Sequence, residues 1–364
     1  MSNFDLNYMK RAIEIAKKGV GFVNPNPLVG AVIVKDGKII GEGYHQKYGE
    51  LHAERNAIAN CCESPQNAHI YVTLEPCCHY GKTPPCTEAI IEAGISKVII
   101  GSTDKNPIVH CNGIQFLKDK GVEVVTGVLE EECDELNEIF FHYILKKRPF
   151  VIMKYAMTVD GKIATTTGRS KWITSEKSRE NVHFTRNRVS AIMVGIGTVL
   201  VDDPMLNCRC ENAGELIRVV CDSNLKIPFE SNIVKTANKI KTYVAYTEDI
   251  ENKSEELQRY GINLILTPKK NNKVDLNYLM DYLGGENIDS ILLEGGSELN
   301  FSALENDIVD KLQVYIAPKI FGGKDAKSAV AGIGVNNPNE AFLFSSPKIQ
   351  MFDEDILIEY KKVR

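Results

Sequence analysis

Three cysteines and a histidine lie within residues 76–86, PCCHYGKTPPC, and the triplet HAE precedes them at residues 52–54. Zinc binds imidazole nitrogen and thiolate sulfur, and catalytic zinc sites use three protein ligands so that water can occupy the fourth position. We expect His52, Cys77 and Cys86 to be these ligands. Zinc lowers the pKa of its water to about 7, and Glu54 can carry that proton to a leaving amine. The pattern predicts hydrolytic deamination with Glu54 as the catalytic residue.

The spacing of these cysteines leaves two points open. Zinc deaminases typically carry HxE and PCxxC, whereas CHYGKTPP lies between Cys77 and Cys86 here, so this loop is longer. Cys78 is an alternative ligand, but its neighbour Cys77 directly follows the proline and is favoured. Cys61 and Cys62 are more typical of core positions than of ligands. The alternative interpretations of the whole cluster are a purely structural zinc site and a group of thiols that bind no metal.

Length and composition indicate two soluble globular domains. The chain has 364 residues, which favours two domains, and we place the boundary between residues 147 and 148. A hydrophobic fraction of 43% and a net charge of −5 predict neither a membrane span nor a nucleic-acid partner. The N-terminal stretch lacks the apolar core of a signal peptide, so we expect a cytoplasmic location and reduced cysteines.

The first 147 residues show an alternating α/β pattern. A hairpin is expected around Asp36 and Gly37, between apolar stretches at 31–34 and 38–40. Helical patterns and buried-strand patterns then alternate, which predicts a sheet covered by helices on both faces. The expected helices are 6–16, 52–60, 87–93, 113–120 and 130–146, and the expected strands are 70–74, 98–101 and 122–126.

A second α/β pattern follows LKKRP at 145–149, where proline disfavours helical geometry in the residue before it. After a strand-like run, Gly295 and Gly296 precede a helix expected to start near Ser297, whose free N–H groups could bind a phosphate. No GxGxxG opens a Rossmann unit, so that fold is not inferred. The expected strands are 150–156, 191–195, 217–222, 242–246, 262–266, 290–294, 312–317 and 356–360.

Three stretches of the first half resemble one enzyme family. NPNPLVGAVIV at 24–34, HAE at 52–54 and PCCHYGKTPPC at 76–86 are similar to the deaminase half of bifunctional riboflavin-biosynthesis deaminase/reductases. The resemblance implies a cytidine-deaminase-like three-layer fold and deamination of a small-molecule pyrimidine ribosylamine phosphate. Cys111 is a departure, because the family usually has glycine there. The implied substrate contacts are Asn26, His45, His79 and Lys82.

The second half resembles the reductase half of the same family. MKYAMTVDGKIAT at 153–165, SKWIT at 170–174, VGIGTVLVDDP at 194–204 and LLEGGSELN at 292–300 carry this similarity. It implies a dihydrofolate-reductase-like α/β fold and NADPH as hydride donor, and Lys154 in the first strand is expected near the cofactor or substrate. The implied cofactor contacts are Ala156, Trp172, Thr198, Asp202, Ser223 and the run from Gly296. The implied substrate contacts are Ser170, Arg186, Leu206, Arg209 and Glu294.

These patterns together predict a two-step enzyme that uses zinc and NADPH. Two other functions share part of the pattern. A nucleic-acid base deaminase would use the same zinc chemistry, but the acidic balance and the lack of a basic aromatic strip disfavour it. A zinc-stabilised scaffold would bind the metal and leave Glu54 dispensable. A homo-oligomer is compatible with the predicted fold, since proteins of this fold often pair.

Overall fold

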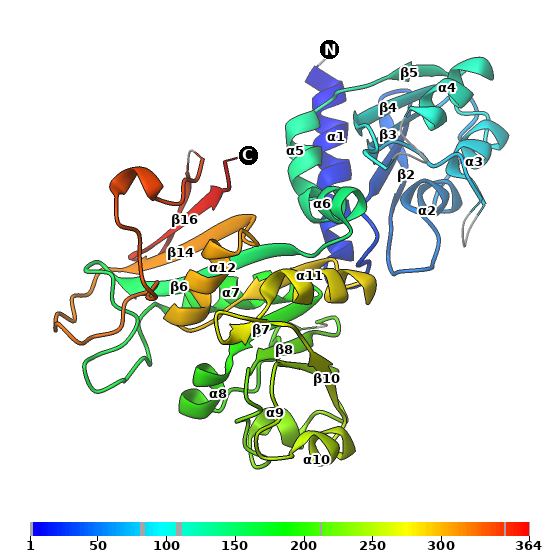
Figure 1. Ribbon diagram of the computed structural model, residues 1–364. Helices are drawn as coiled ribbons and strands as arrows, with labels where there is room; N and C mark the ends of the chain where they lie inside the picture. The colour runs from blue at the N-terminus through cyan, green and yellow to red at the C-terminus, as the bar shows by residue number, and fades with distance from the viewer. Residues whose placement is uncertain (1–2, 81–83, 107–110, 212, 346, 364) are drawn as a thin grey trace. The chain divides into compact units, whose positions relative to one another are not determined.

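The computed structural model describes residues 3–80, 84–106, 111–211, 213–345 and 347–363. The chain divides into two compact units, residues 1–147 and 148–364, each of which has its own sheet and core (Figure 1). Among the described residues, every helix is too short or too polar to cross a membrane.

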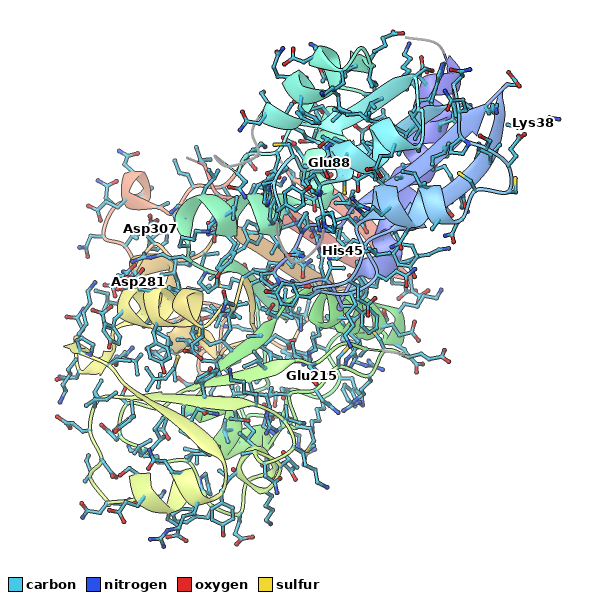
Figure 2. The ribbon with its side chains drawn as sticks, turned by 90° about the vertical axis from the view of Figure 1, so that its right-hand side faces the viewer. Lys38, His45, Glu88, Glu215, Asp281 and Asp307 are labelled. Atoms are coloured by element: carbon cyan, nitrogen blue, oxygen red, sulfur yellow. The ribbon has the colours of Figure 1, made fainter. Side chains whose placement is uncertain are left out.

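The described part of the N-terminal unit contains one five-stranded sheet in the order β2-β1-β3-β4-β5. A tight turn at Asp36 and Gly37 joins β1 and β2, and both residues have the positive φ that this hairpin turn requires. Lys38 projects from the tip of the hairpin (Figure 2). The strands are β1 (Gly30–Lys35), β2 (Lys38–Tyr44), β3 (His69–Leu74), β4 (Lys97–Ser102) and β5 (Glu123–Val125).

Helices cover both faces of this sheet, which confirms the predicted three-layer arrangement. Along β1, Val32 and Val34 pack in one buried cluster and Ala31 and Ile33 in another, because successive side chains of a strand point to opposite faces. The Val32 face is covered by α1 (Asn3–Ala16) and α5 (Glu130–Leu136). The other face is covered by α2 (Ala53–Ala59), α3 (Cys86–Glu92), α4 (Asn112–Asp119) and α6 (Glu138–Lys146).

The prediction of a single helix over 130–146 is wrong. The segment forms α5 and α6, separated at Asn137, whose φ of −109° and ψ of 19° interrupt the helical geometry. The buried Asn137 side chain instead pairs with the main chain of Leu28. Its Oδ1 accepts from Leu28 N at 2.8 Å and its Nδ2 donates to Leu28 O at 3.0 Å. A tertiary contact with a distant loop therefore determines the break, and the local helical pattern did not reveal it.

The described part of the C-terminal unit contains a nine-stranded sheet in the order β10-β9-β8-β7-β13-β6-β14-β16-β15. The strands from β10 to β14 in this order are parallel, and β16 and β15 extend the sheet in antiparallel fashion. They are β6 (Phe150–Thr158), β7 (Ala191–Gly195), β8 (Ile217–Cys221), β9 (Thr242–Tyr246), β10 (Ile262–Leu266), β13 (Ser290–Leu293), β14 (Lys311–Ala317), β15 (Lys348–Phe352) and β16 (Asp355–Lys361).

Eight of these nine strands were expected, and β15 was missed because its side chains are almost all exposed, so no buried pattern marks it. The short hairpin of β11 (Lys269–Lys270) and β12 (Lys273–Val274) was also missed. The helices are α7 (Glu176–Arg188), α8 (Ile196–Asp202), α9 (Asn232–Lys235), α10 (Ser254–Arg259), α11 (Leu276–Gly285) and α12 (Ser297–Glu305).

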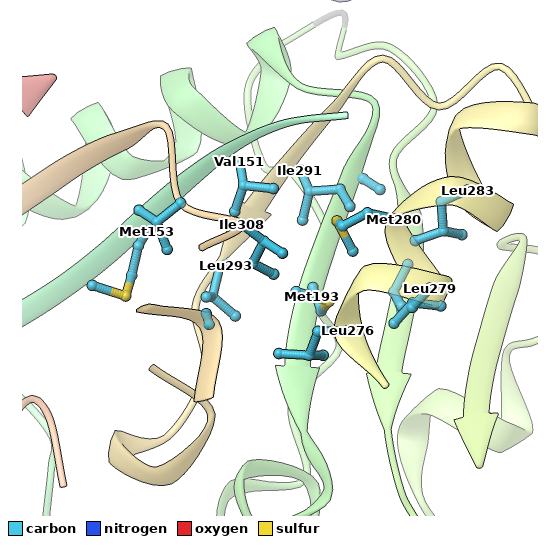
Figure 3. Packing of buried hydrophobic residues seen from close by; sticks show 14 of the residues in the cluster. Val151, Met153, Met193, Leu276, Leu279, Met280, Leu283, Ile291, Leu293 and Ile308 are labelled. Carbon is cyan, nitrogen blue, oxygen red and sulfur yellow. The ribbon is translucent and has the colours of Figure 1, made fainter. Parts of the chain in front are cut away.

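The main core of this unit lies between the sheet and helix α11. Leu276, Leu279 and Leu283 of α11 pack against Met193 and Ile291 of the central strands β7 and β13 (Figure 3). At the start of the unit, Arg148 forms an ion pair with Asp281 on the outer side of the same helix. The central parallel strands are thus held in a buried core, and their carboxyl ends carry the loops that form the candidate site.

Candidate active sites

The structure brings His52, Cys77 and Cys86 together. His52 is the N-cap residue of α2, and Cys86 is the first residue of α3. The His52 Nδ1 atom lies 3.5 Å from Cys77 Sγ and 3.4 Å from Cys86 Sγ. Their three ligand atoms all lie within 4.8 Å of one another, and Cys78 is not part of this group.

These separations fit a zinc ion. With Zn–S and Zn–N bonds of about 2.3 and 2.0 Å, tetrahedral geometry places nitrogen and sulfur ligands about 3.5 Å apart. The observed distances of 3.5 and 3.4 Å therefore match the edges of a zinc coordination sphere. One histidine and two cysteines supply three ligands and leave a fourth position for water, as a catalytic site requires.

The electrostatics of the group favour a thiolate at Cys77. Hydrogen bonds from Cys86 and from His52 lower the pKa of Cys77 to about 4 against the opposing effect of burial. One of these bonds comes from the main-chain N of Cys86, at 3.4 Å, at the start of α3. The pKa of Cys86 is raised instead, by the neighbouring Cys77 thiolate and by burial. The start of α3 thus stabilises a negative charge on Cys77, and a bound zinc would hold both sulfurs as thiolates.

Glu54 lies in the first turn of α2 and is fully buried beside the ligands. Burial and then the charge of Cys77 raise the pKa of Glu54 to about 7. A carboxyl group whose pKa is close to neutral can both accept and release a proton during a reaction. Glu54 therefore has the position and the acidity of a proton carrier.

A cavity of about 330 Å³ opens onto the zinc group, and Asn26, His45 and His79 line it together with His52 and Glu54. His45 is buried among the side chains that Figure 2 shows. Its Nδ1 donates to Leu51 O at 3.1 Å, which leaves Nε2 to accept from the Asn26 amide at 3.2 Å. Burial lowers the pKa of His45, so the ring is held neutral in a fixed orientation.

His79 is exposed at the mouth of the same cavity. Lys82, the fourth predicted contact in this unit, lies outside the described residues. Cys111 adopts the left-handed conformation with a φ of 58°, which glycine adopts more readily than cysteine. The cysteine at this position therefore keeps a backbone geometry suited to glycine.

Two residues that the sequence reasoning missed also line the cavity. Asp104 and Asn106 follow β4, whose carboxyl end lies beside that of the parallel strand β3. Burial raises the pKa of Asp104 to about 6, and its Oδ1 accepts from Asn106 N at 2.8 Å. The sequence could have indicated these two residues. The loop after β3 carries Cys77, and the loops that follow neighbouring parallel strands lie at the same edge of a sheet.

A second cavity, of about 510 Å³, lies in the C-terminal unit at the carboxyl ends of β7 and β8 and the start of α12. Five predicted contacts line it: Ser170, Thr198, Asp202, Ser223 and Gly296. The glycine pair before α12 has two separate roles. A Cβ at Gly295 would lie 3.0 Å from Leu299 Cδ2, so this glycine permits close packing, whereas a Cβ at Gly296 would meet only Thr198 Oγ1, at 3.7 Å.

These features fit a dinucleotide phosphate. The N-terminal ends of α8 and α12 both face the cavity, through Gly195–Thr198 and through Gly296 and Ser297. Free N–H groups at helix starts bind phosphate oxygens, and the missing Cβ at Gly296 leaves room for them. Thr198, Ser223 and Gly296 thus line a cavity whose shape and helix starts suit the phosphates of a dinucleotide.

Three other predicted cofactor contacts, Lys154, Ala156 and Trp172, are not among the residues lining this cavity. Trp172 is 62% exposed, with the Arg179 guanidinium 4.4 Å above its ring. The ammonium of Lys319 donates to Trp172 O at 2.9 Å and thereby fixes the main chain there. Ala156 on β6 packs beside Tyr315 of β14 and is half-buried. Their roles stay predictions.

Lys154, Arg186 and Glu294 form a nearly buried ionic cluster in which the side chains are 13–15% exposed. The Arg186 guanidinium donates to both Glu294 oxygens, at 2.7 and 3.0 Å, and to Asn207 O at 2.9 Å. Lys154 Nζ lies 3.7 Å from Glu294 Oε2. Although burial opposes it, the two cations lower the pKa of Glu294 to about 2. Much of the Arg186 binding capacity is thus used within the protein.

His183, which sequence reasoning missed, connects this cluster to the segment containing Leu206 and Arg209. Its Nδ1 accepts from Arg209 N at 3.2 Å, which leaves the exposed Arg209 side chain extending from an anchored main chain. Burial, then Arg186 and Arg209, lower the pKa of His183 to about 4. Leu206 is buried and has a φ of 47°. The i, i+3 spacing of His183 and Arg186 on α7 could have indicated their shared face.

The geometry defines a zinc-dependent deaminase joined to a dinucleotide-dependent reductase, and comparison with known proteins agrees. Residues 149–358 match the RibD C-terminal domain, and residues 2–102 match the cytidine and deoxycytidylate deaminase zinc-binding region. Riboflavin biosynthesis protein RibD of Actinobacillus pleuropneumoniae is 53% identical over 98% of this chain and 95% of its own length. The Aquifex aeolicus RibD is 40% identical over 98% of both chains.

Solved structures show the same similarity over both units. The diaminohydroxyphosphoribosylaminopyrimidine deaminase/5-amino-6-(5-phosphoribosylamino)uracil reductase of Thermotoga maritima is 40% identical, with a TM-score of 0.85 and 99% of each chain covered. RibD of Acinetobacter baumannii is 32% identical, with a TM-score of 0.86 and the same coverage. The chain belongs to the RibD family of riboflavin biosynthesis proteins. It is a bifunctional deaminase and reductase with zinc and NADPH as cofactors.

Proposed function

We propose that the N-terminal unit hydrolyses the 2-amino group of a diaminopyrimidinone ribosylamine phosphate and that the C-terminal unit then reduces the ribosyl side chain of the product to ribityl. The observation that carries the proposal is the cavity beside Glu54 and the three zinc ligands. The second cavity on the same chain supports the reductive step. The Thermotoga maritima relative is named for a deaminase and a reductase of this kind.

In the deaminase unit, each residue has a defined task. His52, Cys77 and Cys86 would hold the zinc, which would supply the Lewis acidity that makes a water molecule reactive at neutral pH. Glu54 takes a proton from the attacking water and delivers it to the amine, which leaves as ammonia.

Other residues of the same cavity bind the substrate. Asn26, His45 and His79 contact the pyrimidine or its phosphate, and the sequence resemblance assigns Lys82 the same role. As a carboxylate, Asp104 accepts a hydrogen bond from a ring N–H. This carboxylate therefore adds a contact that the sequence reasoning did not include.

In the reductase unit, the protein positions two reactants, and NADPH supplies the hydride. Thr198, Asp202, Ser223 and Gly296 hold the cofactor from the cavity walls, while Lys154, Ala156 and Trp172 contact it from neighbouring segments. Ser170, Arg186, Leu206 and Arg209 contact the substrate, and Glu294 accepts hydrogen bonds from the sugar hydroxyls. The exposed guanidinium of Arg209 suits the substrate phosphate, because a planar fork of donors matches its oxygens. Leu206 would contribute through its main chain, since its side chain is buried.

We further propose a cytoplasmic location and a homo-oligomeric state. All ten cysteines are described and form no disulfide, which suits a reducing compartment. Light scattering of the purified protein measures the oligomeric state directly.

The test supplies purified protein with the diaminopyrimidinone ribosylamine phosphate and follows ammonia release and NADPH oxidation separately. Bound zinc is measured in the same sample. We expect about one zinc per chain, ammonia release without NADPH, and NADPH oxidation only after deamination. Zinc present with neither activity would contradict the proposed substrate, and salt-sensitive binding of RNA in that sample would favour a nucleic-acid base deaminase.

A further inference from the structure

Glu75 is a nearly fully buried carboxylate between β3 and the zinc ligand Cys77. It is among the residues that line the deaminase cavity. A buried carboxylate requires hydrogen-bond donors, because an unpaired charge removed from water is costly. Among the described residues, the donors to Glu75 are main-chain N–H groups of segment 104–114.

Each oxygen of Glu75 accepts two hydrogen bonds. Oε2 accepts from Asp104 N at 3.2 Å and from Cys111 N at 3.0 Å. Oε1 accepts from Gly113 N at 3.1 Å and from Ile114 N at 3.3 Å, in the first turn of α4. All four donors are main-chain N–H groups of a loop or of a helix start, where a negative charge is favourable.

The contact surface between these segments is also shaped for close approach. A Cβ at Gly113 would lie only 2.2 Å from Pro76 O, so α4 rests directly on the main chain that leads into Cys77. On the same side of Glu75, Asp104 Oδ1 accepts from Asn106 N at 2.8 Å. The Glu75 carboxylate is thus connected, through the main chain of Asp104, to both cavity residues that follow β4.

We propose that Glu75 is a positioning residue of the deaminase, which holds segment 104–106 and the start of α4 against the Pro76-Cys77 turn. Asp104 and Asn106 are then kept at a fixed distance from the reacting centre. The Glu75 oxygens are already fully used by the protein, so it acts through these residues and does not bind the substrate itself. This inference rests on the proposed function, because it assigns Asp104 and Asn106 to the pyrimidine ribosylamine phosphate.

Loss of this anchoring has a specific kinetic consequence. Asp104 and Asn106 bind parts of the substrate that do not react, so their displacement weakens the bound substrate and the transition state to a similar extent. Such a change raises KM and leaves kcat nearly constant. A residue needed for the metal would instead change the zinc content and kcat.

The test is Glu75→Gln in the full-length protein. The amide keeps the shape but places an NH₂ group against two N–H donors, so at least two hydrogen bonds are lost. We expect KM for the diaminopyrimidinone ribosylamine phosphate to rise about tenfold, with kcat within about threefold. Zinc content should equal that of the unchanged protein, and reductase activity on the deaminated pyrimidine shows that the chain is folded.

Two variants accompany this one. Glu92→Gln makes the same chemical change at an exposed position of α3 and should leave KM unchanged. Gly113→Ala keeps the Glu75 carboxylate but separates α4 from Pro76 O, so it should raise KM as well. This variant tests the inference even if Glu75→Gln is insoluble. An unchanged KM in both Glu75→Gln and Gly113→Ala, or a fall in kcat at constant KM, would overturn the inference. If the unchanged protein releases no ammonia, the proposed substrate fails instead.

Discussion

The two active sites differ in how far apart in the chain their parts lie. The zinc ligands and Glu54 come from positions 52–86, at the starts of α2 and α3 and, for Cys77, in the loop after β3. The ionic cluster of the reductase instead joins Lys154 on β6, Arg186 on α7 and Glu294 after β13. A local segment thus supplies the first site, and the central strands of a large sheet supply the second.

The chemistry of the two sites explains this difference. A metal selects residue types, because only certain side chains coordinate zinc, and a few turns of chain suffice to hold three ligands. A dinucleotide is bound largely by main-chain N–H groups and beside glycines. Such a site depends on the correct position of the strand ends more than on particular side chains. The reductase should therefore depend on its core, and the deaminase on its metal.

The largest effect is expected from removal of a zinc ligand. Cys86→Ser should reduce deaminase activity more than about 100-fold, because loss of a residue that only supports a metal ligand already costs up to about 100-fold. The amount of zinc bound per chain should also fall. Reductase activity should persist, since the second site contains no part of this segment. Zinc analysis and the two separate assays check this result. Cys62→Ser, an exposed cysteine after α2, is the matched control and should change neither activity.

Replacement of the central carboxylate of the reductase should damage both activity and folding of its unit. Glu294→Gln leaves Arg186 and Lys154 buried without a counter-charge, which costs about 3–5 kcal/mol of unfolding free energy. Urea unfolding and NADPH oxidation measure the two effects, and deamination should continue. Glu305→Gln at the exposed end of α12 is the control. Equal unfolding free energies for the Glu294 and Glu305 variants would contradict the role of the cluster.

The same cluster predicts a dependence on pH. The pKa of Glu294 is lowered to about 2, so its contribution to stability is present above its ordinary pKa and is lost as pH falls from about 4.5 towards 2. The difference in unfolding free energy between the unchanged protein and Glu294→Gln should shrink by about 1 kcal/mol between pH 5.5 and pH 3.5. Unfolding curves at the two pH values measure it. A difference that grows on acidification would show that the carboxylate is not stabilised in the fold.

The smallest effect concerns the strained backbone beside the deaminase cavity. Because Cys111 has a φ of 58°, Cys111→Gly should raise the unfolding free energy by about 0.5–1 kcal/mol. Cys62→Gly, at a position outside the left-handed region, should lower it by a similar amount. Calorimetry of the two variants compares them, and the same sign for both would refute this interpretation of Cys111.

Much of the zinc site could be predicted from the sequence, for a physical reason. His52, Glu54, Cys77 and Cys86 follow from residue type and spacing, since coordination chemistry leaves few alternatives. Asp104 and Asn106 were missed because they are recognised only once β3 and β4 are known to be parallel neighbours. Glu75 was missed as well, since its partners are main-chain groups that no residue type reveals.

Elements with a clear pattern of buried residues could be predicted from the sequence, whereas features determined by tertiary contacts could not. The buried strands of both sheets match their apolar runs, whereas exposed β15 has none. The break at Asn137 depends on a contact with Leu28 that is remote in sequence. In the reductase, the resemblance supplied Arg186 and Glu294, but only the structure shows that these two side chains bind each other.

The most direct test assays the Glu54→Gln variant with each of the two pyrimidine substrates in turn. With the diaminopyrimidinone ribosylamine phosphate, we expect zinc to stay bound, ammonia release to fall about 100-fold or more, and little NADPH to be oxidised. With the deaminated ribosylamine phosphate, NADPH should be oxidised at the rate of the unchanged protein. Full ammonia release by this variant, or rapid NADPH oxidation with the diamino compound, would contradict two separate sites that act in this order.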